Sequence, residues 1–190
     1  MLVLQILGAY LLGAIPFGLL VAKIWKIDIR RRGSGNIGAT NVLRTLGFLP
    51  AAAVFTLDFL KGTLAVYLGY WLSGDPLLVL LLGVAVICGH MFSVFLGFKG
   101  GKGAATGLGV LAGIAPDIFL IAVLAAAALI FLTRYVSVAS ISTSILTALL
   151  MVVYRKPIPY TIAALLTAVL ILIRHIPNLK RLLEGREPKI

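Results

Sequence analysis

The sequence predicts an all-α integral membrane protein with about seven transmembrane helices, two of them short and central. Of its 190 residues, 61% are hydrophobic and 12% are charged, and the mean hydropathy is +1.12. Such a chain has too little polar surface to cover a soluble globule. Apolar runs of spanning length alternate with short basic segments. We therefore expect a single transmembrane domain over residues 1–190.

The expected spans follow the apolar runs in order. The first, Leu2–Ala22, is long enough to cross a bilayer, and Gly13 and Pro16 are expected to kink it. A break at Pro116 divides the apolar residues 107–132 and indicates two short helices rather than one long helix. The remaining spans are expected at Phe48–Trp71, Leu77–Leu96, Tyr135–Val153 and Ile158–Ile173.

The basic residues predict the orientation of these spans. With two helices in residues 107–132, 14 Lys and Arg residues lie on the side of residues 23–47, and only Arg155 and Lys156 lie on the other side. A single helix there would leave a much weaker bias. Basic loops stay in the cytoplasm. We therefore expect a multi-pass plasma-membrane protein with its N-terminus outside and its C-terminus in the cytoplasm.

Composition also argues against several function classes. The net charge of +11 comes from basic residues between apolar runs, where they meet anionic lipid, and no aromatic-basic motif for nucleic acid is present. The single cysteine, Cys88, excludes an intramolecular disulfide. Only six acidic residues occur, without the spacing of a metal site, so we expect neither a metal nor another cofactor.

A glycine-rich break after the third apolar run is the strongest candidate site. Glycines around a lysine let backbone N–H groups approach an anion, and a helix starting after Gly103 would direct its positive end there. The alternative is a plain turn whose lysines touch lipid headgroups. The spacing fits neither a nucleotide P-loop nor a dinucleotide fingerprint. The residues predicted to bind substrate phosphate here are Gly97, Lys99, Gly100, Gly101, Lys102 and Gly103.

A second polar patch lies in the loop before the second span. It combines glycines with short hydrogen-bonding side chains and ends at Arg44, a cation suited to phosphate. The alternative role is capping of the helix that follows. Its candidate site residues are Ser34, Asn36, Thr40, Asn41 and Arg44.

A third patch follows the last span, where His175, Asn178 and Arg181 stand at i, i+3 and i+6 of a helical continuation. Histidine can deprotonate a hydroxyl, asparagine can donate to an oxyanion, and arginine can bind phosphate. The alternative is a basic tail at the membrane interface. The predicted topology places all three patches at the cytoplasmic end of the bundle, where they can converge.

Other polar residues lie within the spans. Asp58 and Lys61 stand at i, i+3, and we expect a structural ion pair rather than a catalytic role. His90 either caps the third span or orients the glycine loop that follows. Ser140 is a candidate to face the site, whereas its neighbours are expected to make hydrogen bonds between helices. These neighbours are Ser137, Thr143 and Ser144.

The chemistry that remains is acyl or phosphoryl transfer by positioning and charge stabilisation, on phosphorylated substrates of which at least one is a lipid. The alternative is a membrane transporter for an organic phosphate, which broken helices and intramembrane charges would also suit. The two are distinguished by whether product is formed or substrate is only moved across the membrane.

Three segments, SGNIGATNVLR, GHMFSVFLGFKGGKGAAT and RHIPNLKRLLEGRE, resemble the signature motifs of the bacterial acyl-phosphate:glycerol-3-phosphate acyltransferase family. The resemblance implies transfer of a fatty acyl group from acyl phosphate to the 1-hydroxyl of glycerol 3-phosphate, giving lysophosphatidic acid and inorganic phosphate at the start of phospholipid synthesis. It implies no cofactor, an active site on the cytoplasmic side of the bacterial inner membrane, and a functional link to the enzyme that makes acyl phosphate.

The same resemblance implies roles for individual residues. Ser34 and Arg44 would be needed for activity, and Lys102 with the glycines around it would hold glycerol 3-phosphate. His175 and Asn178 would act at the reacting centre, and Glu187 would support the structure. Because the phosphate of an acyl phosphate is already a good leaving group, no enzyme nucleophile is required. Either His175 or a substrate phosphate takes the proton of the attacking hydroxyl.

Overall fold

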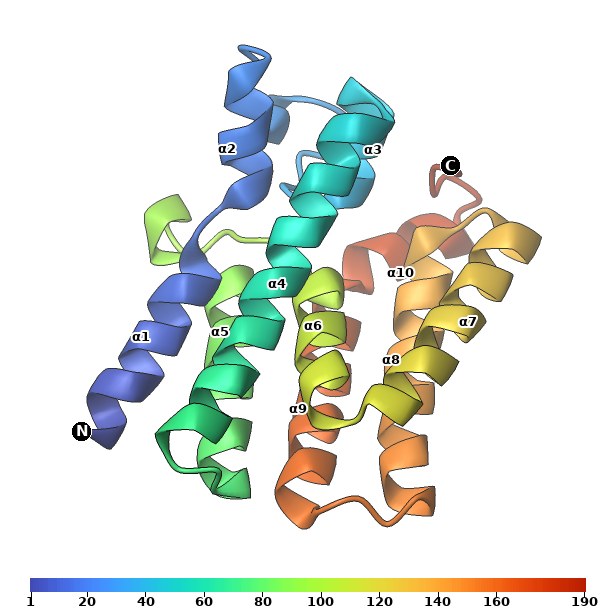
Figure 1. The fold of residues 1–190 in the computed structure, drawn as a ribbon. Helices are drawn as coiled ribbons and strands as arrows, with labels where there is room; N and C mark the ends of the chain where they lie inside the picture. The colour runs from blue at the N-terminus through green and yellow to red at the C-terminus, as the bar shows by residue number, and fades with distance from the viewer.

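Pro16 breaks the first apolar run into two helices, α1 (Leu2–Ala14) and α2 (Phe17–Ile24). The computed structural model describes residues 1–190, all helix and loop without a strand (Figure 1). The break at Pro16 confirms the kink that was expected in the first span. A short 3-10 turn, η1 (Ile29–Arg31), and α3 (Ala39–Leu46) follow at the same end of the bundle.

The next two helices form an antiparallel pair, in which the first is the longer one. They are α4 (Phe48–Leu72) and α5 (Pro76–Met91), and the carboxylate of Asp75 caps the second by accepting from the Leu77 N–H at 3.0 Å. The third apolar run was expected to stay helical to Leu96. Instead α5 ends at Met91, and a 3-10 turn, η2 (Val94–Leu96), leads into the glycine loop.

The central apolar segment is divided at Pro116, as expected, into α6 (Ala104–Ile114) and α7 (Pro116–Thr133). The prediction of two short helices is wrong for α7, whose 18 residues reach about 27 Å and approach the ~30 Å of hydrocarbon. Only α6, with 11 residues, is too short to cross the bilayer. Helix α6 therefore begins inside the bundle rather than at one end of the bundle.

Two further apolar helices complete the bundle, α8 (Val136–Val153) and α9 (Ile158–Arg174). At His175 the chain bends by 52° into α10 (Ile176–Leu183), so the third patch is not a straight continuation of the last span. By length and composition, five helices are able to cross a membrane, or six if this bent pair counts as one span. This finding supports an all-helical integral membrane protein.

The packing fixes α6 against α4. A Cβ on Gly109 would lie 2.0 Å from the carbonyl oxygen of Phe59, so only glycine permits this close approach. The largest apolar core, which includes Val66, Val86 and Ile118, lies among α4–α9. Many leucines and phenylalanines remain exposed on the outer faces, as lipid contact requires. In Figure 1, α2, α3, α10 and the C-terminus share one end of the bundle, opposite the N-terminus.

Candidate functional site

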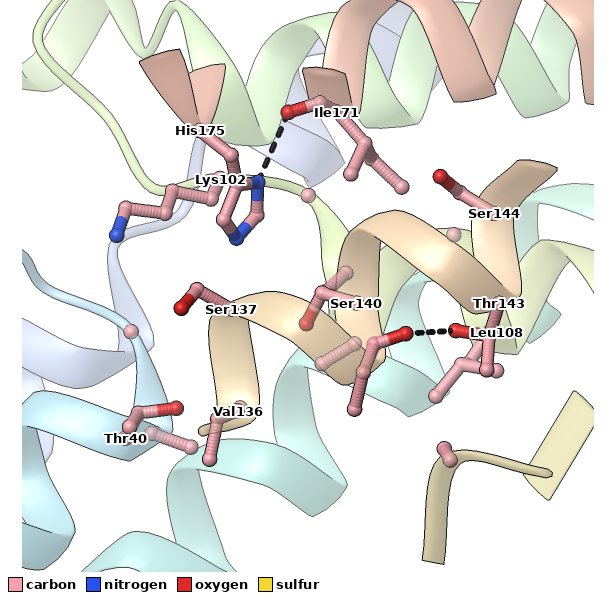
Figure 2. Close-up of a pocket in the computed structure, with 18 of the residues that line it drawn as sticks. Thr40, Lys102, Leu108, Val136, Ser137, Ser140, Thr143, Ser144, Ile171 and His175 are labelled. Atoms are coloured by element: carbon pink, nitrogen blue, oxygen red, sulfur yellow. Dashed lines mark hydrogen bonds between the residues drawn. The ribbon is translucent and has the colours of Figure 1, made fainter. Parts of the chain in front are cut away.

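One pocket of about 390 Å³ opens near the end of the bundle that holds α3 and α10. It receives polar side chains from all three patches recognised in the sequence, which the fold therefore brings together. Its polar lining includes Ser34, Asn36, Thr40, Asn41, Arg44, Lys102, Ser137, Ser140, His175 and Asn178. Figure 2 shows His175, Lys102, Ser137 and Thr40 around a common space.

His175 lies at the bend between α9 and α10 with only 3% of its surface exposed. Its Nδ1 is 2.8 Å from the carbonyl oxygen of Ile171. Because a carbonyl only accepts, Nδ1 carries the proton, and Nε2 keeps its lone pair. Figure 2 shows this second nitrogen directed toward Ser137 and Ser140. Burial lowers the pKa of His175 from 6.5 to about 4, so the ring is neutral near pH 7 and able to accept a proton.

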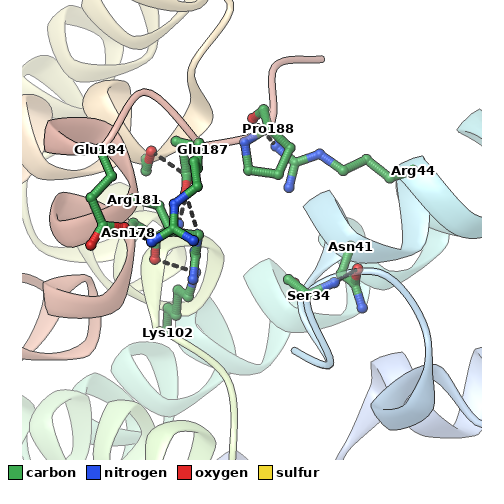
Figure 3. Close-up of polar contacts among 11 residues, drawn as sticks. Ser34, Asn41, Arg44, Lys102, Asn178, Arg181, Glu184, Glu187 and Pro188 are labelled. Atoms are coloured by element: carbon green, nitrogen blue, oxygen red, sulfur yellow. Dashed lines mark hydrogen bonds and ion pairs between the residues drawn. The ribbon is translucent and has the colours of Figure 1, made fainter.

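Lys102 stands at the end of the glycine loop, and its Nζ donates to the Oδ1 of Asn178 at 2.6 Å (Figure 3). Burial lowers the pKa of Lys102 from 10.5 to about 8, and the nearby Glu187 carboxylate opposes that shift. The lysine is therefore mostly charged at pH 7. It offers an ammonium that an entering phosphate can bind.

Glu187 also lines the pocket and holds these residues in place. Its Oε1 accepts from Asn178 Nδ2 at 2.6 Å and from Ser137 Oγ at 2.9 Å, and its Oε2 accepts from Arg181 Nε at 2.8 Å (Figure 3). Burial would raise the pKa of Glu187, but these three hydrogen bonds hold it below its usual range. Arg181 is therefore turned toward Glu187 and does not line the pocket.

The loop from the second patch is shaped by two asparagines. The amide nitrogen of Asn41 donates to the carbonyls of Arg32 and Asn36, at 3.0 and 2.8 Å, and its oxygen accepts from the Ser34 N–H at 2.9 Å. Asn41 is 2% exposed, so its amide holds the loop and leaves little to offer a phosphate. Asn36 accepts from the Gly38 N–H at 2.9 Å. Ser34 and Thr40 remain beside the pocket.

Arg44 reaches the pocket from α3. Its Nη2 donates to the carbonyl of Pro188 at 2.6 Å, and Figure 3 shows this contact above the space between Ser34 and Lys102. Its Nε is buried and has no hydrogen-bond partner within the protein. A buried donor of this kind is costly unless a ligand accepts from it.

The glycine loop differs from the cradle predicted from sequence. The N–H groups of Gly100 and Gly101 donate to the carbonyls of Met91 and His90, at 3.1 and 3.0 Å, so neither is free for an anion. Gly97 and Lys99 do not line the pocket, and both are exposed. What reaches the pocket from this loop is Lys102 and Gly103, followed at once by the start of α6. Gly103 has φ +82°, which favours glycine at this N-cap.

The intramembrane charges do pair, as predicted. Lys61 Nζ lies 2.7 Å from Asp58 Oδ1, and both side chains are almost fully buried. His90 joins them, with Nδ1 2.9 Å from Lys61 Nζ. The backbone carbonyl of His90 accepts from the Gly101 N–H. His90 therefore contacts the glycine loop, as the second of its two expected roles, orienting that loop, requires. Asp58 and His90 also line the pocket.

Several features were not predicted from sequence. Arg174 donates to two carbonyls of the glycine loop, and the only sequence signal was a basic residue beside His175. Thr143 and Ser144 bond to carbonyls of their own helix, so the expectation of interhelical hydrogen bonds is wrong for both. The contact of Arg44 with Pro188 joins residues 144 positions apart and has no local signature.

The pocket continues into an apolar part between α6, α7, α8 and α9. Along α9 its lining runs from His175 to Ala163, and 12 residues at ~1.5 Å each give a depth of about 18 Å. One leaflet of a bilayer has about the same hydrocarbon thickness. The apolar lining includes Leu108, Leu111, Ile114, Val123, Ala126, Ile130, Ala163, Ala164 and Ala168.

A family model described as glycerol-3-phosphate acyltransferase matches residues 3–185. The chain is 46% identical over 189 residues to a glycerol-3-phosphate acyltransferase of Thermoanaerobacter pseudethanolicus, covering 99% of this chain and 95% of that one. It is 46% identical over 191 residues to a protein of the same name from Bacillus velezensis, covering 100% of this chain and 98% of the other.

Two solved structures share the fold. One is PlsY, an integral membrane glycerol 3-phosphate acyltransferase, in its glycerol 3-phosphate form, with a TM-score of 0.96 and 42% identity over 100% of this chain and 95% of that chain. The other is the lysophosphatidic acid form, with a TM-score of 0.94 and 41% identity over the same shares.

Proposed function

This chain belongs to the glycerol-3-phosphate acyltransferase family, and from that premise we propose how its pocket carries out the reaction. The enzyme transfers a fatty acyl group from acyl phosphate to glycerol 3-phosphate and forms lysophosphatidic acid and inorganic phosphate. The observation that supports this best is a single pocket of about 390 Å³, which has a basic polar mouth and an apolar extension. A phosphate with a long hydrocarbon chain requires both parts.

We place the phosphates at the polar mouth. Lys102 supplies an ammonium, Arg44 supplies a guanidinium with an unpaired Nε, and Ser34 lies on the facing loop. The first N–H groups of α6 follow Gly103 at the same place, and a helix N-terminus favours an anion. The acyl chain then extends along α9 between α6, α7 and α8. The reacting carbonyl, which joins phosphate to chain, falls at the boundary near His175.

The reaction needs no covalent enzyme intermediate. The 1-hydroxyl oxygen of glycerol 3-phosphate forms a bond to the acyl carbon, and the bond from that carbon to the phosphate oxygen breaks. His175 Nε2 accepts a hydrogen bond from the hydroxyl and orients it. As the new bond forms, the hydroxyl proton passes along this hydrogen bond to Nε2 and then to the departing phosphate, because a phosphate with pKa ≈ 6 is more basic than an imidazole with a pKa of about 4. Lys102 stabilises the charge that develops.

The orientation in the membrane belongs to the same proposal. The seven apolar segments, with α6 as the short one, place the N-terminus outside and the C-terminus in the cytoplasm, since 14 of the 17 Lys and Arg residues then lie on the pocket's side. The pocket mouth would face the cytoplasmic side of a bacterial inner membrane, from which the water-soluble glycerol 3-phosphate would enter. The acyl donor would enter from the lipid.

Phosphate release from palmitoyl phosphate by the detergent-purified protein tests this function, with and without glycerol 3-phosphate and in the presence of a chelator. We expect release that depends on glycerol 3-phosphate, with an equal amount of lysophosphatidic acid. Release without acceptor would indicate a hydrolase. No release by folded protein, together with glycerol 3-phosphate uptake into proteoliposomes, would establish a transporter instead.

A further inference from the structure

The glycine loop is held on one side by the end of α5. The N–H groups of Gly100 and Gly101 pair with the carbonyls of Met91 and His90. A Cβ on Gly100 would lie 2.1 Å from the His90 carbonyl oxygen, and one on Gly101 would lie 2.1 Å from His90 Nε2. The glycines are therefore required by His90, which occupies the space that a side chain would fill.

The ring of His90 is itself fixed by the buried ion pair. Lys61 Nζ lies 2.9 Å from His90 Nδ1 and 2.7 Å from Asp58 Oδ1, and it donates to the Ile15 carbonyl at 3.2 Å. The same Nδ1 lies 3.4 Å from Asp58 Oδ1, so both members of the ion pair contact this nitrogen. The ion pair thus determines the orientation of the ring beneath Gly101.

Arg174 contacts the same two glycines through their backbone carbonyl groups. Its Nη2 donates to the Gly100 carbonyl at 2.8 Å and its Nε to the Gly101 carbonyl at 3.1 Å. Its guanidinium carbon lies 5.6 Å from the centroid of the Phe92 ring. The planar fork spans two successive carbonyls, which the single ammonium of a lysine cannot do in the same way.

We propose that Arg174 and His90 are positioning residues that form a clamp on the glycine loop and so set where Lys102 and the start of α6 meet the phosphate of glycerol 3-phosphate. Arg174 immediately precedes His175, so the clamp also ties the phosphate-binding loop to the residue that orients the hydroxyl. This inference rests on the proposed function. Neither residue needs to touch the substrate.

Variants of Arg174 test the clamp. Arg174→Lys keeps the charge but loses the fork, and Arg174→Gln loses both. We expect each to raise KM for glycerol 3-phosphate about tenfold, since small displacements of binding groups are costly. The KM for acyl phosphate should change less than threefold. The matched control is Arg186→Gln, because Arg186 is exposed and pairs only with Glu184, and it should match wild type.

Three results would overturn the clamp. Wild-type kinetics in Arg174→Lys would show that charge alone matters. An equal rise in KM for both substrates would show a general loss of the site. A lower Tm with unchanged KM would show a purely structural role. If the wild-type protein itself forms no lysophosphatidic acid, the proposed function fails, and not the clamp specifically.

A second pair of variants keeps the clamp testable if the Arg174 variants do not fold. Gly101→Ala should raise KM for glycerol 3-phosphate because its Cβ meets the His90 ring. The double variant Gly101→Ala/His90→Ala opens space for that Cβ. We expect the double variant to have a lower KM than Gly101→Ala alone, as coupled neighbours show. Additive effects would contradict the proposed contact.

Discussion

Replacing Glu187 with glutamine should change both stability and the pH dependence of the reaction. Glu187 accepts three hydrogen bonds, from Asn178, Ser137 and Arg181, and donates none. A glutamine has one acceptor oxygen and one NH₂ group, so in either rotamer its NH₂ faces at least one of these donors. A charge-assisted hydrogen bond contributes about 1.5–3 kcal/mol. We expect a loss of about 2 kcal/mol and a decrease in Tm of about 5 °C.

The effect on activity follows from Lys102. The Glu187 carboxylate raises the pKa of this lysine against the effect of burial, and together they leave it at about 8. The charged lysine is the active form, so kcat/KM in the wild type should fall as the pH rises through about 8. Removing the carboxylate's charge should lower the pKa of Lys102 further. The basic limb of Glu187→Gln should therefore lie at a lower pH than that of the wild type.

The assay is phosphate release from palmitoyl phosphate with glycerol 3-phosphate, measured between about pH 5.5 and 9.5, with Tm recorded for each protein. Glu184→Gln is the control, because Glu184 is exposed and bonds to Arg186. A lower Tm with an unchanged basic limb would show that Glu187 acts only on folding. A Glu187→Gln protein identical to wild type would refute the hydrogen-bond network as the support of Asn178.

Four further predictions concern other parts of the pocket. His175→Ala should lower kcat by ~10²–10⁴, and a change confined to KM would exclude its role at the hydroxyl. In the wild type, because the neutral ring is the active form and burial lowers its pKa to about 4, any acid limb of kcat/KM near pH 6 should come from the substrate phosphate and persist in His175→Ala; a limb that is lost in this variant would contradict the low pKa of His175. Val123→Phe should narrow the apolar part of the pocket and reduce activity on palmitoyl phosphate more than on lauroyl phosphate, whereas equal losses would place the chain elsewhere. Asp58→Asn removes the carboxylate that pairs with the buried Lys61, at a cost of about 3–5 kcal/mol, and an unchanged Tm would refute that dependence.

The apolar runs predicted the helices well because the bilayer imposes length and composition directly. The kink at Pro16 and the break at Pro116 were both predictable from sequence, since proline restricts the backbone at its own position. The end of α5 at Met91 was not, because residues 92–96 are apolar except for Ser93 and yet leave the helix for the loop. Apolar composition indicates burial or lipid contact and does not show where a helix ends.

The candidate site was predicted as a set of residues and less well as a set of roles. Glycine at positions 100 and 101 indicates that another group approaches the backbone, but sequence does not show whether that group is a phosphate or a histidine; here it is His90. Asn41 was expected to bind phosphate and instead holds its own loop. Long-range contacts, such as that of Glu187 with Ser137, depend on helix packing and have no local pattern.

The short length of α6 explains why one pocket can serve both halves of the donor. A helix that crossed the whole bilayer would begin at the membrane surface, far from the apolar space between α7, α8 and α9. Because α6 has only 11 residues and packs along α4, its first N–H groups and Lys102 lie directly above that apolar space. In acyl phosphate the reacting carbon lies between the phosphate and the chain. In the proposed binding mode, that carbon lies at the boundary where His175 is held.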